Sequence, residues 1–159
     1  TKGAKVIVSG PYGTCFRREN REDTPLLLVG GGSGLAPLLS ILSDQIAEAP
    51  QRKIRLFYGA RTQADLFWLD RFEALTAQLP DFRFVPALSA ADDDDKWQGE
   101  RGFIHDVLQR SLKEEALGDG TDVYACGPAP LIDAAIPVLQ IAGIEPERIY
   151  FDKFTPATN

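Results

Sequence analysis

The stretch LLLVGGGSGLAPLLSIL, residues 26–42, joins three local patterns without a break. It begins with four apolar residues in a row, as in a strand that is buried on both faces. Four glycines follow within positions 30–34, and leucines then recur at 35, 38, 39 and 42, which is the spacing of one helix face. We therefore predict a buried strand that turns sharply, through glycines, into an amphipathic helix.

The same alternation of strand and helix patterns continues along the chain. Short apolar runs predict strands at 5–10, 26–30, 54–60, 82–88, 122–127 and 148–154. Helical spacing predicts further helices at about 64–79, 103–112 and 129–142. Pro137 should kink the last of these helices unless that helix begins later.

This alternation predicts an α/β fold, because apolar strands that alternate with helices form a parallel sheet covered on both faces. We expect a doubly wound sheet of five main strands in the order 3-2-1-4-5, where strand 1 is the run at 26–30. Ligands of such sheets bind beyond the carboxyl ends of the strands, where the strand order reverses. The expected site therefore lies between the ends of the strands at 26–30 and 122–127.

Composition narrows the classes of function. The chain has 159 residues, of which 44% are hydrophobic, and its net charge is −6, which suits one folded domain. An acidic chain without clustered Lys and Arg does not favour nucleic-acid or membrane-surface binding. No apolar run is long enough to cross a membrane, and four consecutive Asp at 92–95 predict a solvated loop.

The chain has two cysteines and one histidine. Cys15 and Cys126 could pair, but a cytoplasmic chain with two reduced thiols is the simpler interpretation. These three residues do not have the spacing of a zinc site, so we expect no metal. We interpret His105, which lies on a predicted helix, as structural.

The first predicted strand end carries GGGSGLAP. Glycines permit a sharp turn and allow a phosphate to approach the backbone, and the start of the following helix favours an anion. The pattern is not the usual dinucleotide fingerprint, because Leu35 stands where a third glycine is needed, and it is not a P-loop. The alternative is a tight glycine turn without a ligand. The candidate pyrophosphate-binding residues are Gly30, Gly31, Gly32, Ser33, Gly34, Leu35, Ala36 and Pro37.

The second strand end carries ACGPAP. Gly127 allows a close approach of backbone, and Pro128 is suited to the start of a helix because its missing N–H is not needed there. Cys126 is either part of the site or a small buried apolar residue, and the sequence physics leaves both readings open.

The strand at 54–60 ends in YGARTQADLF. Arg61 could reach a ribose or a phosphate, and Asp65 could accept hydrogen bonds from ribose hydroxyls. Alternatively, Arg61 is a solvated charge and Asp65 is an acidic residue favoured at a helix N-terminus. Thr62 fits the N-cap of the predicted helix.

Five motifs occur in a recognisable order: GPYG at 10–13, GGGSGLAP at 30–37, YGAR at 58–61, ACGP at 125–128 and IYFDKF at 149–154. In this the chain resembles the NAD(P)-binding domain of ferredoxin–NADP reductase-like flavoprotein reductases. The resemblance covers nearly the whole chain. It is closest to the NADH-dependent reductase components of bacterial phenol-, toluene- and methane-type monooxygenases and of ring-hydroxylating dioxygenases.

The resemblance implies that NADH gives a hydride to FAD, and that electrons then pass singly to a [2Fe-2S] centre and a partner oxygenase. It places the pyrophosphate on GGGSGLAP and the adenosine ribose near Arg61 and Asp65. It places the nicotinamide near Cys126, Gly127 and Pro128, with Cys126 as a positioning wall at the catalytic centre and not as a nucleophile. A C-terminal aromatic residue would cover the flavin, Phe154 by our choice and Phe151 as the alternative.

The resemblance also divides the chain. Residues 1–13 would be the last strand and linker of an FAD-binding barrel, with a turn at Pro11, Tyr12 and Gly13, and residues 14–159 the NAD(P)-binding domain. The Arg-x-Tyr-Ser/Thr segment of the flavin domain and a four-cysteine cluster motif do not occur in this sequence, and neither does an initiator Met. We therefore expect a piece of a longer cytoplasmic enzyme that is inactive without its FAD domain, with FAD and the cluster bound only in the full-length protein.

Three points remain open. NADH is favoured over NADPH, because Asp65 would repel a 2′-phosphate, although Arg61 and Thr62 could form part of a phosphate site. A nucleotide-sensing domain of the same fold, without electron transfer, is the alternative function. A structural subunit that docks an oxygenase through its acidic surface is a third possibility, because fold alone does not separate these classes.

Overall fold

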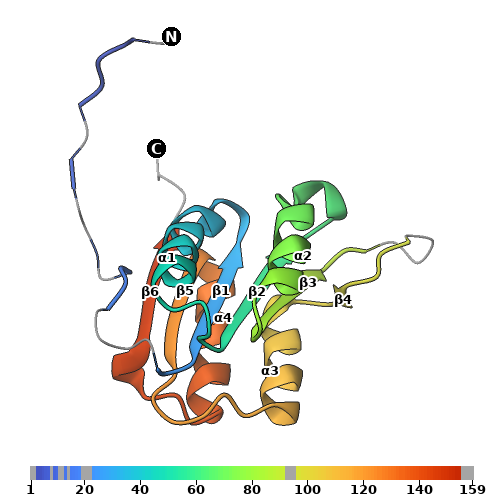
Figure 1. Cartoon of the computed structure of the whole chain (residues 1–159). Coiled ribbons are helices and arrows are strands. Elements are labelled where there is room, and N and C mark those ends of the chain that lie inside the picture. The colour runs from blue at the N-terminus through green and yellow to red at the C-terminus, as the bar shows by residue number, and fades with distance from the viewer. Residues whose placement is uncertain are drawn as a thin grey trace.

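Figure 1 shows the computed structural model of the chain, which describes residues 3–7, 9–10, 13, 15–18, 23–91 and 96–154. Its strands are β1 (Leu26–Gly31), β2 (Ile54–Ala60), β3 (Phe82–Leu88), β4 (Glu100–Arg101), β5 (Asp122–Pro128) and β6 (Ile149–Phe154). Its helices are α1 (Leu35–Glu48), α2 (Leu69–Gln78), α3 (Ile104–Glu114) and α4 (Ala129–Ile141). Short 3-10 turns occur at η1 (Gly32–Gly34), η2 (Gln63–Asp65) and η3 (Pro146–Arg148).

All six strands form one parallel sheet in the order β4-β3-β2-β1-β5-β6. The predicted order of the five main strands is confirmed. The sheet has six strands where five main strands were predicted, because the two-residue strand β4 extends it beside β3. Two polar residues, Glu100 and Arg101, carry no apolar pattern from which a strand could be predicted.

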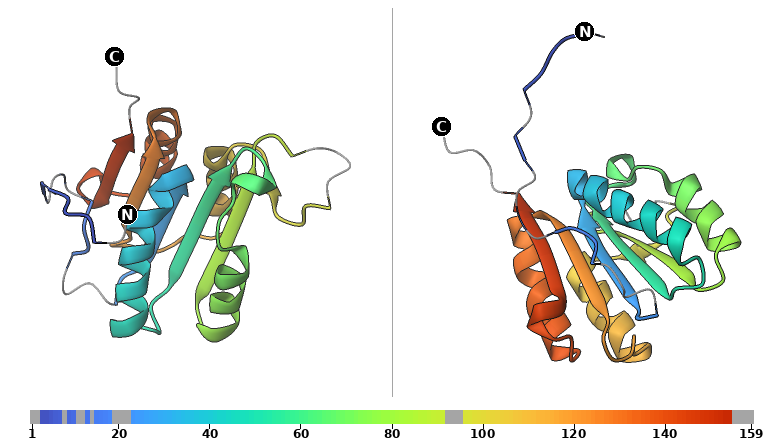
Figure 2. Two further views of the ribbon diagram at one scale, coloured as in Figure 1. Left: turned by 90° about the horizontal axis from the view of Figure 1, so that it is seen from above. Right: turned by 60° about the vertical axis from the view of Figure 1, so that its left-hand side comes forward.

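Helices cover both faces of the sheet. Figure 2 shows α1 and α2 together on one face and α3 and α4 on the other. Alternate residues of each central strand face opposite layers, as expected for a two-residue period. Leu26 and Leu28 of β1 therefore join the cluster under α1 and α2, while Leu27 and Val29 join the cluster under α3 and α4.

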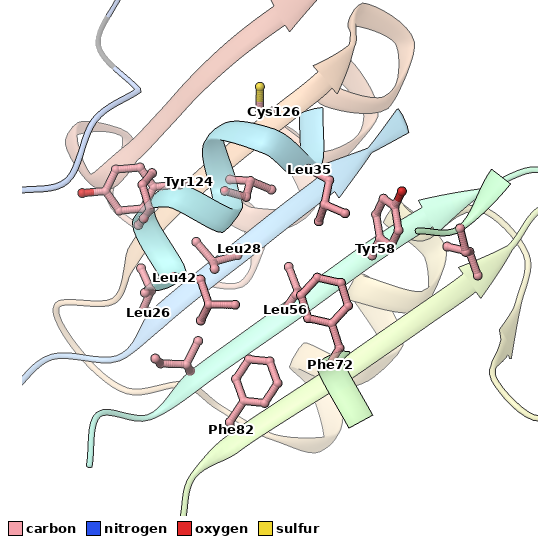
Figure 3. Close-up of a cluster of buried hydrophobic side chains, with 14 of the residues drawn as sticks. Leu26, Leu28, Leu35, Leu42, Leu56, Tyr58, Phe72, Phe82, Tyr124 and Cys126 are labelled. Atoms are coloured by element: carbon pink, nitrogen blue, oxygen red, sulfur yellow. The ribbon is translucent and has the colours of Figure 1, made fainter. Parts of the chain in front are cut away.

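The cluster under α1 and α2 contains most of the buried aromatic side chains of the described residues, namely Tyr58, Phe72, Phe82 and Tyr124. Figure 3 shows it spread across four strands, with Cys126 at one end and Phe82 at the other. Phe72 of α2 is fully buried and packs on Phe84 with ring centroids 4.7 Å apart. Burial of apolar side chains on both faces holds the strand tips in fixed positions relative to one another.

Two element predictions needed correction. The predicted strand at 5–10 is not formed in the described residues of that range, where Val6 and Ile7 lie exposed without a ladder partner. The predicted helix at 64–79 is interrupted. Thr62 and Asp65 close the short turn η2, and Trp68 then adopts left-handed backbone at φ 60°, so that α2 starts only at Leu69.

Three further predictions concern the helix that contains Pro137, the turn at 11–13 and the acidic loop. Helix α4 runs through Pro137 as one helix that begins at Ala129, so it does not start later than predicted. Two predictions lie outside the described residues: the turn residues Pro11 and Tyr12, and the acidic loop at 92–95.

Charged side chains fix the amino ends of the strands, opposite the expected site. Arg55, at the start of β2, donates hydrogen bonds from Nε and Nη2 to the two carboxylate oxygens of Glu115, which follows α3, at 3.2 and 2.6 Å. Arg55 also pairs with Asp81 at 2.8 Å. These contacts tie the end of α3 to β2.

Candidate functional site

The tips of β1 and β5 are in backbone contact. The strands are parallel neighbours, with Gly30 opposite Cys126. A Cβ atom on Gly34 would lie 2.0 Å from the carbonyl oxygen of Cys126 and 2.7 Å from the nitrogen of Gly127. Only glycine fits at position 34, and its absence of a side chain lets the start of α1 pack directly on the end of β5.

Gly32 serves a different purpose. Its φ of +56° lies in the left-handed region, and a Cβ atom placed there would have no atom within 4 Å. The turn therefore has an exposed face with room for a ligand, directly before the start of α1. A helix start with such an open glycine beside it is suited to an anion such as a phosphate.

The other predicted residues of this loop take distinct positions. Ser33 and Ala36 are exposed, Pro37 is half-buried, and Leu35 is buried in the cluster under α1. Gly30 and Gly31 end β1, where a Cβ would meet a leucine methyl of α1 or α4 within 2.7 Å. Gly30 and Leu35 thus fit a packing role, while the exposed residues fit ligand contact.

A cavity of about 620 Å³ opens beside this loop, on the α3 and α4 face of the sheet. This volume is within the range of small-molecule and cofactor sites. It is bounded by the carboxyl ends of β1, β2, β3 and β5 and by the starts of α3 and α4. Five residues predicted for the site line it: Gly31, Gly32, Arg61, Asp65 and Pro128.

Arg61 and Asp65 are both exposed at the end of β2. Asp65 Oδ2 accepts hydrogen bonds from the backbone N–H of Thr62 at 3.0 Å and from its hydroxyl at 2.8 Å. These hydrogen bonds, together with the charge of Arg61, lower the pKa of Asp65. Asp65 is thus an acidic residue in the first turn of η2, where it forms a capping box with the N-cap Thr62, and it also presents a negative charge to the cavity.

Cys126 does not line the cavity. Its side chain is 0% exposed and belongs to the cluster under α1, on the opposite face of the sheet. Burial raises the pKa of its thiol to about 12, so the group is neutral at physiological pH and unsuited to nucleophilic attack. Cys15 packs against the same cluster, and both cysteines are free thiols.

The C-terminal aromatic residues lie on the neighbouring strand. Phe154 stands opposite Pro128 in the register of β5 and β6 and is half-buried. Phe151 is 41% exposed, and the ammonium group of Lys153 lies 5.2 Å from the centre of its ring. Of the two, Phe154 is the one at the carboxyl tip of its strand, beside the predicted nicotinamide end.

The cavity is also lined by residues that the sequence analysis did not assign to the site. Among them are Phe103, which is 60% exposed, and His105, which flank the first residue of α3. Their rings stack with centroids 5.6 Å apart and an interplanar angle of 18°. Nothing in the helical spacing of α3 marks these residues, because their position depends on how α3 meets the sheet.

Two negative observations apply to the described part of the chain. No three His, Cys, Asp or Glu residues in it gather closely enough to hold a metal ion. None of its helices combines the length and hydropathy of a membrane span.

Residues 28–136 match the family model described as the oxidoreductase NAD-binding domain. The chain belongs to this NAD-binding domain family. The match contains the glycine turn, the end of β2 and the tip of β5, which are the elements around the cavity. The family resemblance inferred from the five motifs is confirmed.

Known relatives of this NAD-binding domain are reductases. It is 39% identical over 157 residues to the reductase component DmpP of phenol 2-monooxygenase from Pseudomonas sp. (strain CF600), a match that covers 99% of this chain and 44% of that protein. It is 38% identical over 154 residues to one component of the Na(+)-translocating NADH-quinone reductase of Yersinia pestis (strain Pestoides F), covering 96% and 37%. The chain thus spans less than half the length of these relatives.

The fold comparison agrees. The crystal structure of the Amycolatopsis cytochrome P450 reductase GcoB superposes with a TM-score of 0.80 at 36% identity, covering 94% of this chain and 44% of that one. The chain is therefore an NAD-binding domain of the ferredoxin reductase-like type.

Proposed function

We propose that this domain binds NADH and holds it for hydride transfer to an FAD carried by an adjoining flavin-binding domain. In this division, residues 1–13 lead from the flavin domain and residues 14–159 form the nicotinamide-binding half. The cofactors supply the redox chemistry, and the protein supplies position and electrostatics. Hydride transfer needs the two reacting atoms about 3–3.5 Å apart, so positioning is the main task of the chain.

The observation that carries the proposal is the open left-handed turn at Gly32. It lies on the rim of the cavity, directly before α1, and at the point where the sheet order reverses between β1 and β5. A pyrophosphate there would meet backbone and not side chains. The nicotinamide would then lie toward Gly127 and Pro128, and the adenosine ribose toward Arg61 and Asp65.

Asp65 favours NADH over NADPH. Its lowered pKa keeps the carboxylate charged at neutral pH, and the carboxylate lies on the cavity wall. A ribose diol can donate hydrogen bonds to it, whereas a 2′-phosphate would be repelled. Arg61 is the neighbouring cation that could offset this repulsion in part. Calorimetric titration with NADH and NADPH should show tighter binding of NADH, and equal affinities would contradict this preference.

Cys126 and Phe154 would act at the flavin end of the site. The buried side chain of Cys126 packs in the cluster under α1 and so supports the tip of β5 from the face opposite the cavity. Phe154 lies beside that tip, on β6. We assign Cys126 an indirect positioning role behind the tip of β5, in place of the wall against the nicotinamide that the resemblance implied, and Phe154 the role of aromatic cover of the flavin. Phe151 remains the alternative, because its ring is the more exposed of the two on β6.

We infer the later steps of electron transfer by analogy with the related reductases. In the full-length protein, FAD would pass electrons through a [2Fe-2S] ferredoxin domain to an oxygenase in the cytoplasm, with no nucleic-acid or membrane partner. The sensor and docking alternatives have no specific observation in their favour, while DmpP and GcoB both carry the name of a reductase.

Two glycines allow a matched test of the phosphate site. Gly32 and Gly143 both adopt positive φ, at +56° and +88°, and neither has an atom within 4 Å of an added Cβ. Gly32→Ala and Gly143→Ala should therefore lose similar stability, on the order of 1–2 kcal/mol. Only Gly32→Ala should weaken NADH binding, by about tenfold or more, in calorimetric titration. Equal affinity in both variants would refute the proposed position of the pyrophosphate.

A further inference from the structure

We propose that Arg18 is a positioning residue for hydride transfer, because it fixes the segment through which the chain enters this domain. We call residues 15–18 the entry segment. This inference deepens the proposed function and rests on it, because residues 1–13 lead from a flavin domain only under that proposal.

The entry segment runs along α1, away from the proposed site. Cys15 lines a hollow together with Pro37, which lies in the first turn of α1. Two residues later, Arg17 pairs with Asp44 and Glu48 in the second half of the same helix. The described residues before Cys15 extend past the carboxyl ends of the strands, where the cavity opens (Figure 1). The preceding chain therefore leaves the domain at the edge of the sheet where the proposed function places the flavin.

Arg18 holds the end of the entry segment between two aromatic rings. Its Cζ atom lies 3.9 Å from the ring centre of Phe16 and 4.4 Å from that of Tyr150, both within the range of a cation–π interaction. The ring of Tyr150 stacks in turn on that of Tyr124, with centroids 5.1 Å apart. The hydroxyl of Tyr124 accepts a hydrogen bond from the backbone N–H of Arg18 at 2.9 Å. Arg18 is thereby fixed to both β5 and β6.

Arg17 adds a second attachment, to α1. Its Nη2 donates a hydrogen bond to Glu48 Oε1 at 3.1 Å, and its Nε pairs with Asp44. Both carboxylates are about half exposed, so solvent screening weakens these ion pairs. Arg18 instead stacks between rings and bonds to the buried Tyr124, which makes it the stronger attachment.

This attachment matters because hydride transfer needs the two reacting atoms about 3–3.5 Å apart. A flexible linker only raises the local concentration of a joined domain and does not orient it. A chain that is fixed from Cys15 onward restricts the orientations open to the flavin domain. Arg18 contacts the cluster under α1, on the face of the sheet opposite the cavity, so its loss should affect orientation and not NADH binding.

Backbone motion in the 159-residue chain tests the attachment itself. Order parameters of the Phe16 and Arg17 amides, from ¹⁵N relaxation, should be about 0.8 in the unaltered chain and fall below about 0.6 in Arg18→Ala. Amide signals of the strands should keep their positions, which shows that the variant folds. Arg71→Ala is the matched control, because Arg71 also lies over an aromatic ring, that of Trp68 at 5.5 Å, but on α2. It should leave the entry segment rigid.

Flavin reduction tests the consequence. In the reductase with its flavin domain, Arg18→Ala should slow stopped-flow flavin reduction at saturating NADH by about tenfold or more, since small displacements cost much of the rate. The Kd for NADH from calorimetry should change by less than about twofold. Phe16→Leu, which removes one exposed ring, should slow reduction to a smaller extent, and Phe16→Tyr should keep the unaltered rate. Arg71→Ala should change neither quantity.

The outcomes separate this inference from the proposed function. If Arg18→Ala keeps a rigid entry segment or an unaltered rate of flavin reduction, the role of Arg18 is refuted and the proposed function stands. Equal losses of NADH affinity and of rate would also refute it, because they would indicate damage to the domain and not a change of position. If the unaltered reductase neither binds NADH nor reduces its flavin, the proposed function fails and the role of Arg18 fails with it.

Discussion

Gly34 is the residue at which the two halves of the site meet. The space for its side chain is already filled by the backbone of Cys126 and Gly127. A methyl group at this position must push α1 away from β5, since backbone atoms cannot rotate aside. The stability of the fold and the geometry of the site therefore depend on the same contact.

We predict that Gly34→Ala lowers the free energy of unfolding by about 1–3 kcal/mol, the usual cost of overpacking a dense interior. Urea unfolding followed by circular dichroism would measure this. Gly32→Ala, which has open space around it, should cost less because it adds only backbone strain. A Gly34→Ala variant as stable as the unaltered chain would show that α1 does not pack on β5 as described.

Substitution of Cys126 tests whether this residue positions NADH for hydride transfer or contributes to the affinity for NADH. Because its side chain lies on the face of the sheet away from the cavity, Cys126→Ala should leave NADH binding unchanged within about twofold. In the reductase with its flavin domain, the same change should slow flavin reduction by about tenfold or more, because small displacements cost much of the rate.

Cys15→Ala is the control, since Cys15 packs on the same cluster without lying on β5. Stopped-flow flavin reduction and calorimetry measure the two effects independently. If Cys126→Ala weakened binding as much as it slowed reduction, its role would be in affinity and not in positioning.

At the scale of elements, α3 carries one wall of the cavity and is anchored at its far end by Glu115. The hydrogen bonds from Arg55 are the main cause that lowers the pKa of Glu115 from 4.5 to about 2, and Lys53 adds to it. A carboxyl whose pKa is lower in the folded than in the unfolded protein stabilises the fold at pH values above its unfolded-state pKa. Its contribution is therefore present above about pH 4.5 and is lost as the pH falls toward 2.

We predict that Glu115→Gln lowers the free energy of unfolding at pH 7 by on the order of 1 kcal/mol, because the partly exposed pair is screened by solvent. The difference between the variant and the unaltered chain should shrink between about pH 5 and pH 2. Urea titrations across this range would measure it. A difference that does not change with pH would mean that the ion pair contributes nothing to the anchoring of α3.

Element by element, the sequence was informative where burial dictates the pattern. The central strands are mostly apolar, so the order of the five main strands followed from alternation and topology alone. The prediction of element boundaries failed where polar contacts determine where an element starts. The capping of η2 by Thr62 and Asp65 delays α2, and β4 forms only because it lies beside β3.

At the scale of the whole molecule, the meeting of the two strand tips was predictable, because topology places the carboxyl ends of neighbouring parallel strands together. The position of Phe103 and His105 could not be predicted, since it depends on how the start of α3 packs on a strand that is distant in the sequence. The orientation of Cys126 away from the cavity depended in the same way on which face of β5 it occupies.

The purified chain should not retain FAD. Every strand in its described residues belongs to one parallel sheet, and its sequence has no Arg-x-Tyr-Ser/Thr segment to hold a flavin. Absorbance at the flavin bands after purification in the presence of FAD should therefore be absent. A yellow protein with one flavin per chain would contradict the assignment of flavin binding to another domain.

The central claim is that Gly30–Gly34 and the tip of β5 together hold the pyrophosphate and nicotinamide of one dinucleotide. The most direct measurement is the change in backbone amide chemical shifts of the ¹⁵N-labelled chain when NADH is added. We predict the largest changes at Gly31, Gly32, Ser33, Gly34 and Gly127, with the amino ends of the strands unaffected. Saturable NADH binding that leaves these five amides unchanged would contradict the account.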